Sequence, residues 1–389
     1  MKRLAILMAL LALTALTQSA AATSWQTPYQ LIDNRIIIPV RINGTAGFSM
    51  VSDTGASGMT VTPEVAQRLH LAMKSAGTVG GAGAGRVSVS NARLRSLEVA
   101  GVSLGAMACT VLDLAPIRNA IGFAKLDGIV GYDVLSHYAV AVDADRETLT
   151  LSSGNYNAPP NARRVDYAVR SGFITLPARI DSVAGNVILD TGDRSSLTLF
   201  GPFARHYGFY SRAPALHSVV TGYGVGGQLK SDVFRTRLSL FGYNVGDVLT
   251  RAPVGPAGAF DSSGPSGSVG TGFLRRFNII YDLPRKELVL WPSIRFSFHE
   301  RYDPAGMWVA TGARGPVVTS VLSGGPAYKA GVRSGDTILA VNGIQTATWL
   351  PIRLRSWLYD RERYSTITMM LESKTGARVS RTVHLRELI

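Results

Sequence analysis

Short β-type apolar runs separated by turn residues fill much of this chain. Residues 36–42 form one run, an Asn-Gly pair at 43–44 is a hairpin turn signal, and residues 48–51 form the returning strand. Residues 63–69 begin with a proline after a threonine cap, which predicts a short helix. The 41 glycines and 18 prolines agree with many short strands and turns. The pattern predicts a mainly β protein.

The pattern occurs twice, and both copies end in the same tripeptide. One apolar run precedes Asp53-Thr54-Gly55, and another precedes Asp190-Thr191-Gly192. Matching residues follow downstream: Val130-Gly131 with Val269-Gly270, Leu135 with Leu274, Tyr138 with Phe277, Asp143 with Asp282, Arg146 with Arg285, Leu149 with Leu288, and Leu151 with Leu290. Their offset is constant (270 − 131 = 139 and 282 − 143 = 139), so we infer one structural unit used twice.

The doubled motif resembles the aspartic peptidases of the pepsin and retropepsin type. The resemblance rests on residues 53–57, on residues 190–192, and on the apolar-apolar-Gly run 129–131 with its counterpart 268–270. It implies two retropepsin-like β-barrel lobes related by pseudo-two-fold symmetry. It also implies an endopeptidase that acts on protein or peptide substrates without a cofactor.

In such an enzyme, Asp53 and Asp190 would be the catalytic residues. Two carboxylates a few ångströms apart cannot both ionise cheaply, so they share one proton and titrate as a pair. The ionised partner draws a proton from water, and the protonated partner donates to the scissile carbonyl oxygen. A homodimer is not needed, because one chain carries both aspartates, and we expect a monomer.

The neighbouring residues would support this pair. Gly55 and Gly192 have no Cβ, so backbone N–H groups can approach the carboxylates. By resemblance, the hydroxyls of Thr54 and Thr191 would form hydrogen bonds across the lobe interface. Ser57 would form a hydrogen bond to the outer oxygen of Asp53.

The second motif departs from the family pattern after its glycine. Asp193-Arg194 stands where the family has a small residue followed by Ser or Thr. Ser195 or Ser196 could replace the missing hydroxyl after a shift of one or two residues. Asp193 could pair with Arg194 or face solvent. The rival hypothesis follows from this departure: a peptide-binding protein that does not cleave.

Two glycine-rich segments, 77–85 and 222–227, lie at similar places in the two copies. By position they match the flap hairpins that close over a bound substrate, and the alternative is a slack glycine loop. As flaps they would bring Gly80, Gly81, Tyr223 and Gly224 to the substrate cleft. Neither segment is followed by the Gly-Lys-Ser/Thr of a phosphate-binding loop.

Residues 315–343 resemble the core of a PDZ domain, a small α+β fold. The matching elements are Ala330-Gly331, Gly335-Asp336-Thr-Ile338 and Val341-Asn342-Gly343. Residues 350–359 would form the helix beside the peptide groove, and residues 366–371 and 380–385 the final strands.

PDZ domains bind an extended peptide as an added strand and present backbone N–H groups to its terminal carboxylate. The expected loop comprises Gly306, Met307, Trp308 and Val309. Trp308 stands where a second small residue would help the amides approach, so capture of peptide C-termini stays open.

The start of the chain is typical of a secretory signal peptide. A basic start, an apolar run at 4–16 and small residues at 19–22 are its three parts. The run is short for a membrane span, and no cysteine follows it, so we expect export to the bacterial periplasm without a stable membrane anchor. The expected organisation is a signal peptide at 1–22, a first lobe at 29–152, a linker at 153–164, a second lobe at 165–293 and a PDZ domain at 298–389.

Composition narrows the remaining possibilities. The formal net charge of +14 is spread along the chain, and no nucleic-acid-binding motif is present. We interpret the chain as a basic secreted protein, with attraction to an anionic envelope surface or an acidic substrate as the alternative. The six histidines are scattered, so no metal site is predicted. The single cysteine, Cys109, lies in an apolar run and is expected to be a core thiol.

Overall fold

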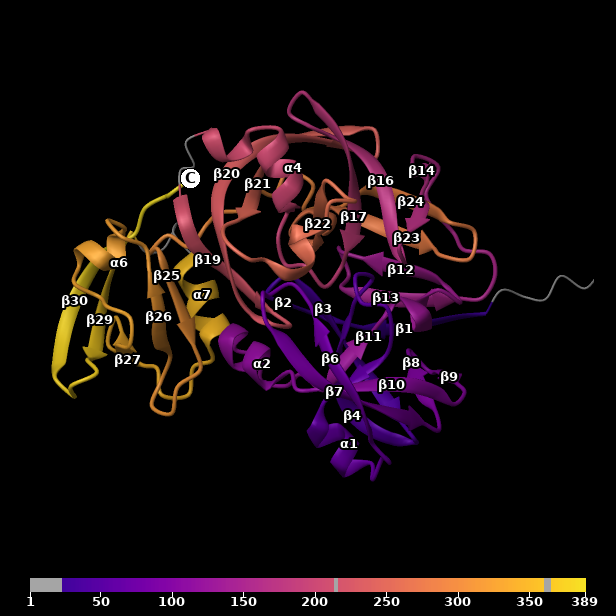
Figure 1. Ribbon diagram of the computed structural model, residues 1–389, viewed down its shortest axis with the longest axis horizontal. Coiled ribbons are helices and arrows are strands. Elements are labelled where there is room, and N and C mark those ends of the chain that lie inside the picture. The colour runs from indigo at the N-terminus through magenta and orange to yellow at the C-terminus, as the bar shows by residue number, and fades with distance from the viewer. Residues whose placement is uncertain (1–22, 213–215, 360–364) are drawn as a thin grey trace, which may run out of the picture.

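The computed structural model describes residues 23–212, 216–359 and 365–389 (Figure 1). The predicted signal peptide, residues 1–22, lies outside the described residues. The described chain is mainly β and forms two lobes followed by a third, smaller domain. In Figure 1 the first lobe is indigo to magenta, the second lobe pink to orange, and the C-terminal domain orange to yellow.

The first lobe is built on one sheet with the strand order β6-β7-β10-β5-β11-β4-β3-β8-β9, and β2 pairs with β3. Its strands are β2 (Gln30–Ile32), β3 (Arg35–Ile42), β4 (Thr45–Ser52), β5 (Thr60–Val61), β6 (Lys74–Gly80), β7 (Arg86–Leu94), β8 (Leu97–Val99), β9 (Val102–Leu104), β10 (Met107–Leu112) and β11 (Gly128–Val130). Its helices are α1 (Pro63–Arg68), α2 (Ala115–Ile121) and α3 (Tyr132–Leu135). Thr62 caps α1 by accepting a hydrogen bond from Val65 N, as the sequence predicts.

The second lobe repeats this plan. Its sheet has the order β15-β16-β17-β22-β18-β21-β20-β19. The strands are β15 (Ala168–Arg170), β16 (Phe173–Ile180), β17 (Val183–Asp190), β18 (Leu197–Leu199), β19 (Leu216–Gly224), β20 (Gly227–Leu240), β21 (Tyr243–Pro253) and β22 (Gly267–Gly270). The helices are α4 (Gly201–His206) and α5 (Thr271–Leu274), with 3-10 turns η1 (Phe209–Ser211) and η2 (Gly258–Asp261).

A six-stranded sheet joins the two lobes, in the order β1-β13-β12-β23-β24-β14. Its strands are β1 (Ser24–Pro28), β12 (Ala139–Asp143), β13 (Thr148–Ser152), β14 (Arg163–Asp166), β23 (Phe277–Asp282) and β24 (Glu287–Pro292). Strands β12 and β23 come from different lobes and pair antiparallel. β1 lies ahead of the predicted start of the first lobe at residue 29, and β14 begins inside the predicted linker 153–164. Both strands extend the shared sheet, so the predicted boundaries of the lobes and the linker do not coincide with the boundaries of the strands.

The C-terminal domain has its own core and a sheet in the order β25-β26-β27-β29-β30, with β28 paired to β27. Its strands are β25 (Met307–Ala310), β26 (Val317–Val321), β27 (Thr337–Val341), β28 (Ile344–Gln345), β29 (Thr366–Glu372) and β30 (Arg378–His384). Its helices are α6 (Pro326–Lys329) and α7 (Pro351–Tyr359). The predicted helix and final strands of this domain are confirmed. In the described part of the chain, none of the helices has the length and apolar character to cross a membrane.

Candidate active site

Each Asp-Thr-Gly motif follows a strand that pairs in parallel with an apolar-apolar-Gly strand. Asp53 comes directly after β4, which pairs with β11, and its N–H donates to Val130 O at 3.0 Å. Asp190 ends β17, which pairs with β22. The repeated apolar run behind each aspartate therefore forms the same local structure twice, and the two aspartates lie at the interface of the lobes.

The two motif threonines form a symmetric set of hydrogen bonds across this interface. The N–H of Thr54 donates to Thr191 Oγ1 at 3.0 Å, and the N–H of Thr191 donates to Thr54 Oγ1 at 3.1 Å. The hydroxyl of Thr54 donates to Leu189 O at 2.9 Å, and that of Thr191 donates to Ser52 O at 2.8 Å. Both threonines are buried, so these bonds fix the two aspartate loops against each other.

Each aspartate lies against the glycine of the opposite motif. A Cβ added to Gly55 would lie 2.4 Å from the carboxyl carbon of Asp190, and one added to Gly192 would lie 2.4 Å from that of Asp53. No side chain fits at either position. Asp53 Oδ1 accepts from the N–H groups of Gly55 at 2.7 Å and Ala56 at 3.1 Å. Glycine at these positions therefore permits the close approach of the two carboxyl groups.

The Asp190 loop repeats the same hydrogen bonds. Its Oδ1 accepts from the N–H groups of Gly192 at 2.9 Å and Asp193 at 3.1 Å. Ser57, expected to form a hydrogen bond to Asp53, lines the cleft instead. Among the described residues, its side chain forms no hydrogen bond to Asp53, whose Oδ1 accepts from the backbone N–H groups of Gly55 and Ala56.

Burial raises the pKa of both carboxyl groups. The pKa of Asp190 lies well above its usual value, first through burial and then through the neighbouring carboxylates of Asp53 and Asp193. Burial also raises the pKa of Asp53, while hydrogen bonds and the nearby guanidinium of Arg35 act in the opposite direction. The pair can therefore share one proton, as two adjacent carboxyl groups with different surroundings do.

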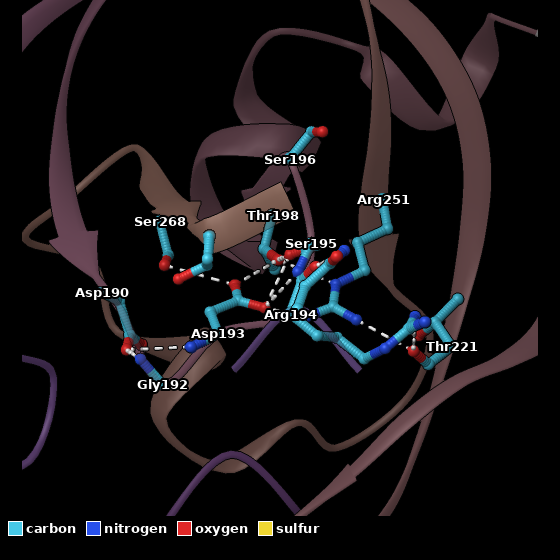
Figure 2. Close-up of polar contacts among 12 residues, drawn as sticks. Asp190, Gly192, Asp193, Arg194, Ser195, Ser196, Thr198, Thr221, Arg251 and Ser268 are labelled. Carbon is cyan, nitrogen blue, oxygen red and sulfur yellow. Dashed lines mark hydrogen bonds and ion pairs between the residues drawn. The ribbon is translucent and has the colours of Figure 1, made fainter. Parts of the chain in front are cut away.

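Asp193 neither pairs with Arg194 nor faces solvent (Figure 2). It is buried, and its Oδ1 accepts from Arg251 Nη2 at 2.5 Å. Ser195 donates to Asp193 Oδ1 and Ser196 donates to Glu300, both at 2.6 Å, so neither replaces a hydroxyl at Asp190. Both alternatives for Asp193, and the proposed serine substitution, are wrong. These alternatives involve only sequence neighbours of Asp193, whereas its partner Arg251 comes from strand β21.

The two predicted glycine segments form hairpins whose tips contact each other. Residues 81–85 connect β6 to β7, and residues 225–226 connect β19 to β20. Gly83 N donates to Val225 O and Gly85 N to Gly226 O, both at 2.8 Å. Ala259 N donates to Gly81 O at 2.8 Å. The tips therefore close over the aspartates as flaps, and they are not slack loops.

The flaps and both lobes enclose a cavity of about 450 Å³ above the aspartates. The predicted flap residues Gly80, Gly81, Tyr223 and Gly224 all line it. The first lobe contributes an apolar side with Leu112, Leu114, Ile117, Phe123, Leu126 and Ile129. The second lobe contributes another with Phe173, Ile188, Phe200, Leu229 and Phe260. The cavity thus has one apolar wall from each lobe on either side of the carboxyl pair.

The PDZ segment expected to be a carboxylate-binding loop is different in the structure. Met307, Trp308 and Val309 are buried and belong to strand β25, and Gly306 precedes that strand with a φ of 68°. The N–H groups of Ala305 and Gly306 donate to the buried carboxylate of Asp303, both at 2.9 Å. Burial raises the pKa of Asp303 to about 6. Within the expected loop, the N–H group of Gly306 already donates to the protein's own Asp303 carboxylate, which disfavours capture of a peptide carboxylate at this residue.

The seam between β25 and α7, where a PDZ domain would add a peptide strand, contacts the end of helix α2 from the first lobe (Figure 1). Thr311 N donates to Asn119 O at 2.9 Å, beside the end of β25. Trp308 Nε1 donates to Ala120 O at 3.0 Å, and Arg355 Nη2 donates to Ile121 O at 2.6 Å. The last carbonyl groups of α2, which lack partners inside the helix, are thus satisfied by the PDZ domain.

Sequence reasoning missed a buried carboxylate at the junction of the three parts. Asp33 contacts Arg35 at 2.7 Å, Arg194 at 3.0 Å and Arg355 at 3.6 Å. These arginines come from the first lobe, the second aspartate loop and helix α7. They hold the pKa of Asp33 below its usual value despite its burial. The residues around Asp33 carry no local signal of its distant partners, because Arg194 and Arg355 meet it only in the folded chain.

Cys109, Asp143 and Asp282 have structural roles. Cys109 is a buried free thiol in β10, as expected. Asp143 and Asp282 each accept hydrogen bonds from a following arginine, Arg146 or Arg285, and serve their turns. Among the described residues, no group of three or more His, Cys, Asp or Glu side chains could bind a metal ion.

Two segments of the chain match models of known families. Residues 38–134 match the family model for aspartyl proteases, and residues 317–359 match a PDZ domain model. The chain is therefore similar to aspartyl proteases over the first segment and to PDZ domains over the second. Among solved structures, an aspartic proteinase from Irpex lacteus matches with 15% sequence identity and a TM-score of 0.46, covering 72% of this chain and 99% of that one. No curated protein sequence matches the chain.

Proposed function

We propose that this protein is an aspartic endopeptidase whose catalytic residues are Asp53 and Asp190. The observation that carries the proposal is the mutual packing of the two carboxyl groups on the glycines of the opposite motifs. This contact brings two acids from separate lobes to one point under a closed pair of flaps. A purely structural aspartate would need neither the cross-lobe contact nor the cavity above it.

The chemistry follows from the shared proton. A water between the carboxyl groups loses a proton to the ionised aspartate and attacks the peptide carbonyl. The protonated aspartate donates to the carbonyl oxygen, and the resulting tetrahedral intermediate collapses as the leaving nitrogen takes up a proton. The apolar walls of the two lobes would accept bulky apolar side chains on either side of the scissile bond.

The test is cleavage of a quenched fluorescent peptide with apolar residues at its centre by the protein without residues 1–22. We expect a bell-shaped pH dependence. Asp53→Asn and Asp190→Asn should each lower kcat by at least about a hundredfold. Asp143→Asn is the matched control, because Asp143 also follows a strand but serves a turn. If either catalytic variant cleaves as fast as its parent, the proposal fails and the non-catalytic peptide-binding function is favoured.

We also propose that the PDZ domain regulates the cleft and does not primarily recruit substrate. Its peptide seam is filled by residues 119–121. Ile117, on the same helix α2, lines the substrate cavity. A peptide that entered the seam would compete with the end of α2 and thereby move one wall of the cavity.

Hydrogen exchange tests this role. Trp308→Phe removes the indole N–H donated to Ala120, and Arg355→Met removes the donor to Ile121. Both should raise exchange in residues 115–122 and change kcat/KM severalfold. Arg353→Met is the control, since Arg353 is exposed on the same helix. Unchanged exchange in both variants would contradict regulation through α2.

Export remains part of the proposal, with residues 1–22 as its signal. Fractionation of cells that express the full chain should recover the shortened protein from the periplasm. Retention of the full-length chain in the cytoplasm would contradict this.

A further inference from the structure

The second lobe differs from the first at two matched positions around its aspartate. Thr60 and Thr198 occupy matching positions in the two lobes. Thr60 pairs with Ile129 of the first apolar-apolar-Gly strand, and Thr198 pairs with Ser268 of the second. Strand register likewise matches Thr110 with Arg251. Ala56 matches Asp193, because each donates an N–H to its aspartate at 3.1 Å. Uncharged residues in the first lobe thus correspond to an ion pair in the second.

The ion pair is enclosed and fully bonded (Figure 2). Asp193 accepts from Ser195 N at 3.0 Å, Thr198 Oγ1 at 2.9 Å and Ser268 Oγ at 3.3 Å, besides Arg251. The side chains of Asp193 and Arg251 are 3% and 7% exposed. A buried carboxylate with this many donors stays ionised, because each bond offsets part of its lost hydration.

The pair connects the aspartate loop to a flap. Arg251 Nη1 donates to Thr221 O at 3.0 Å, and Thr221 lies on β19, the strand that leads into the second flap. Arg251 Nε donates to Thr198 Oγ1 at 2.8 Å. The network therefore joins β18, β19, β21 and β22 directly behind Asp190.

We propose that Asp193 and Arg251 are positioning residues that hold the Asp190 loop and make the two halves of the carboxyl pair electrostatically unequal. This inference rests on the proposed function of Asp53 and Asp190. The charged groups around the pair are distributed unevenly. The carboxylate of Asp193 raises the pKa of Asp190, whereas the guanidinium of Arg35 lowers that of Asp53. Arg251 balances Asp193, and Arg194 is turned toward Asp33.

Four proteins test the proposal: the parent, Asp193→Asn, Arg251→Met, and the double variant Asp193→Ala with Arg251→Thr. The double variant gives positions 193 and 251 the residue types found at the matching first-lobe positions, Ala56 and Thr110. It therefore removes both charges with side chains that this fold already accommodates. In Arg251→Met, the hydrogen bonds from Ser195, Thr198 and Ser268 still favour the ionised form of Asp193.

Activity requires the shared proton, so its upper pH limit follows the pKa of the group that holds it. Asp193→Asn leaves a lone cation and should move this limit down by about one pH unit, and Arg251→Met leaves a lone anion and should move it up by a similar amount. The double variant should fall between the parent and Asp193→Asn. The expected order is Arg251→Met highest, then parent, double variant and Asp193→Asn.

A second readout does not need cleavage. In an Asp53→Asn background, titration of ¹³C-labelled aspartate carboxyl groups by NMR should give the same order for Asp190. In each variant, the Asp190 signal is assigned by its loss when Asp190→Asn is added. Thermal unfolding checks that each variant folds. Equal or same-direction shifts in the two single variants would overturn the proposal and leave the pair a purely structural one. If the opposite shifts appear but the parent cleaves nothing, the proposed function fails while this inference stands.

Discussion

The two lobes share one backbone plan but differ in where they carry buried charge. In the first lobe the turn between its first two strands contains Asp33, which binds three arginines. The corresponding turn of the second lobe, between β15 and β16, contains Ser171. Conversely, the second lobe carries the Asp193–Arg251 pair where the first has Ala56 and Thr110. The two lobes therefore share their strands and the two aspartates but differ in their electrostatic surroundings.

The motif threonines test how equal the lobes are. Thr54→Val and Thr191→Val each leave a buried N–H and a buried carbonyl without partners, so each should cost about 4 kcal/mol of unfolding free energy. Because the hydrogen bonds are symmetric, the two losses should agree closely in urea unfolding. Thr62→Val is the control, since its side chain caps only α1. A large difference between the two motif variants would break the comparison.

Asp33→Ser copies the second lobe's turn residue into the first. This substitution should lower the free energy of unfolding by about 3 kcal/mol at neutral pH, because three arginines lose a buried counter-charge. The pKa of Asp33 is lowered in the folded protein, so its contribution exists above the unfolded value and disappears as the pH falls through the folded one.

Urea unfolding of parent and Asp33→Ser from pH 7 downward measures this difference. The two stabilities should converge in acid, and Ser171→Ala in the matching turn should change little at any pH. A stability gap that persists unchanged in strong acid would mean that Asp33 acts through packing and not through charge.

The matched turn residues Asp143 and Asp282 should give the smallest difference in stability between the lobes. Both are paired with a following arginine, yet their side chains are 24% and 0% exposed. Asp282→Asn should cost about 1 kcal/mol and Asp143→Asn less than half of that, since exposed pairs contribute little. Thermal unfolding of the two variants checks the order. Equal losses would show that burial does not separate these matched residues.

The fold and the carboxyl pair were accessible from sequence because they depend on repeated local patterns. The constant spacing of the two copies predicted the lobes, and the Asp-Thr-Gly motifs predicted the loops that carry Asp53 and Asp190. The partner of Asp193 was not accessible, because Arg251 reaches it only through the pairing of β18 with β21. From sequence, Trp308 is expected to obstruct a ligand, whereas its indole N–H donates to Ala120 O of the first lobe. Contacts between domains leave no local periodicity to detect.

The sheet shared by both lobes also limits how a polypeptide can enter. Strands β12 and β23 join the lobes beneath the cleft, and the threonine bonds join them at its floor. At the roof, the tips of β6–β7 and β19–β20 are joined by two backbone hydrogen bonds at 2.8 Å, without a shared sheet. For the proposed endopeptidase, entry of a polypeptide and release of its fragments would require the two hairpin tips to separate. On an easily cleaved bond, this opening motion would then limit the turnover rate.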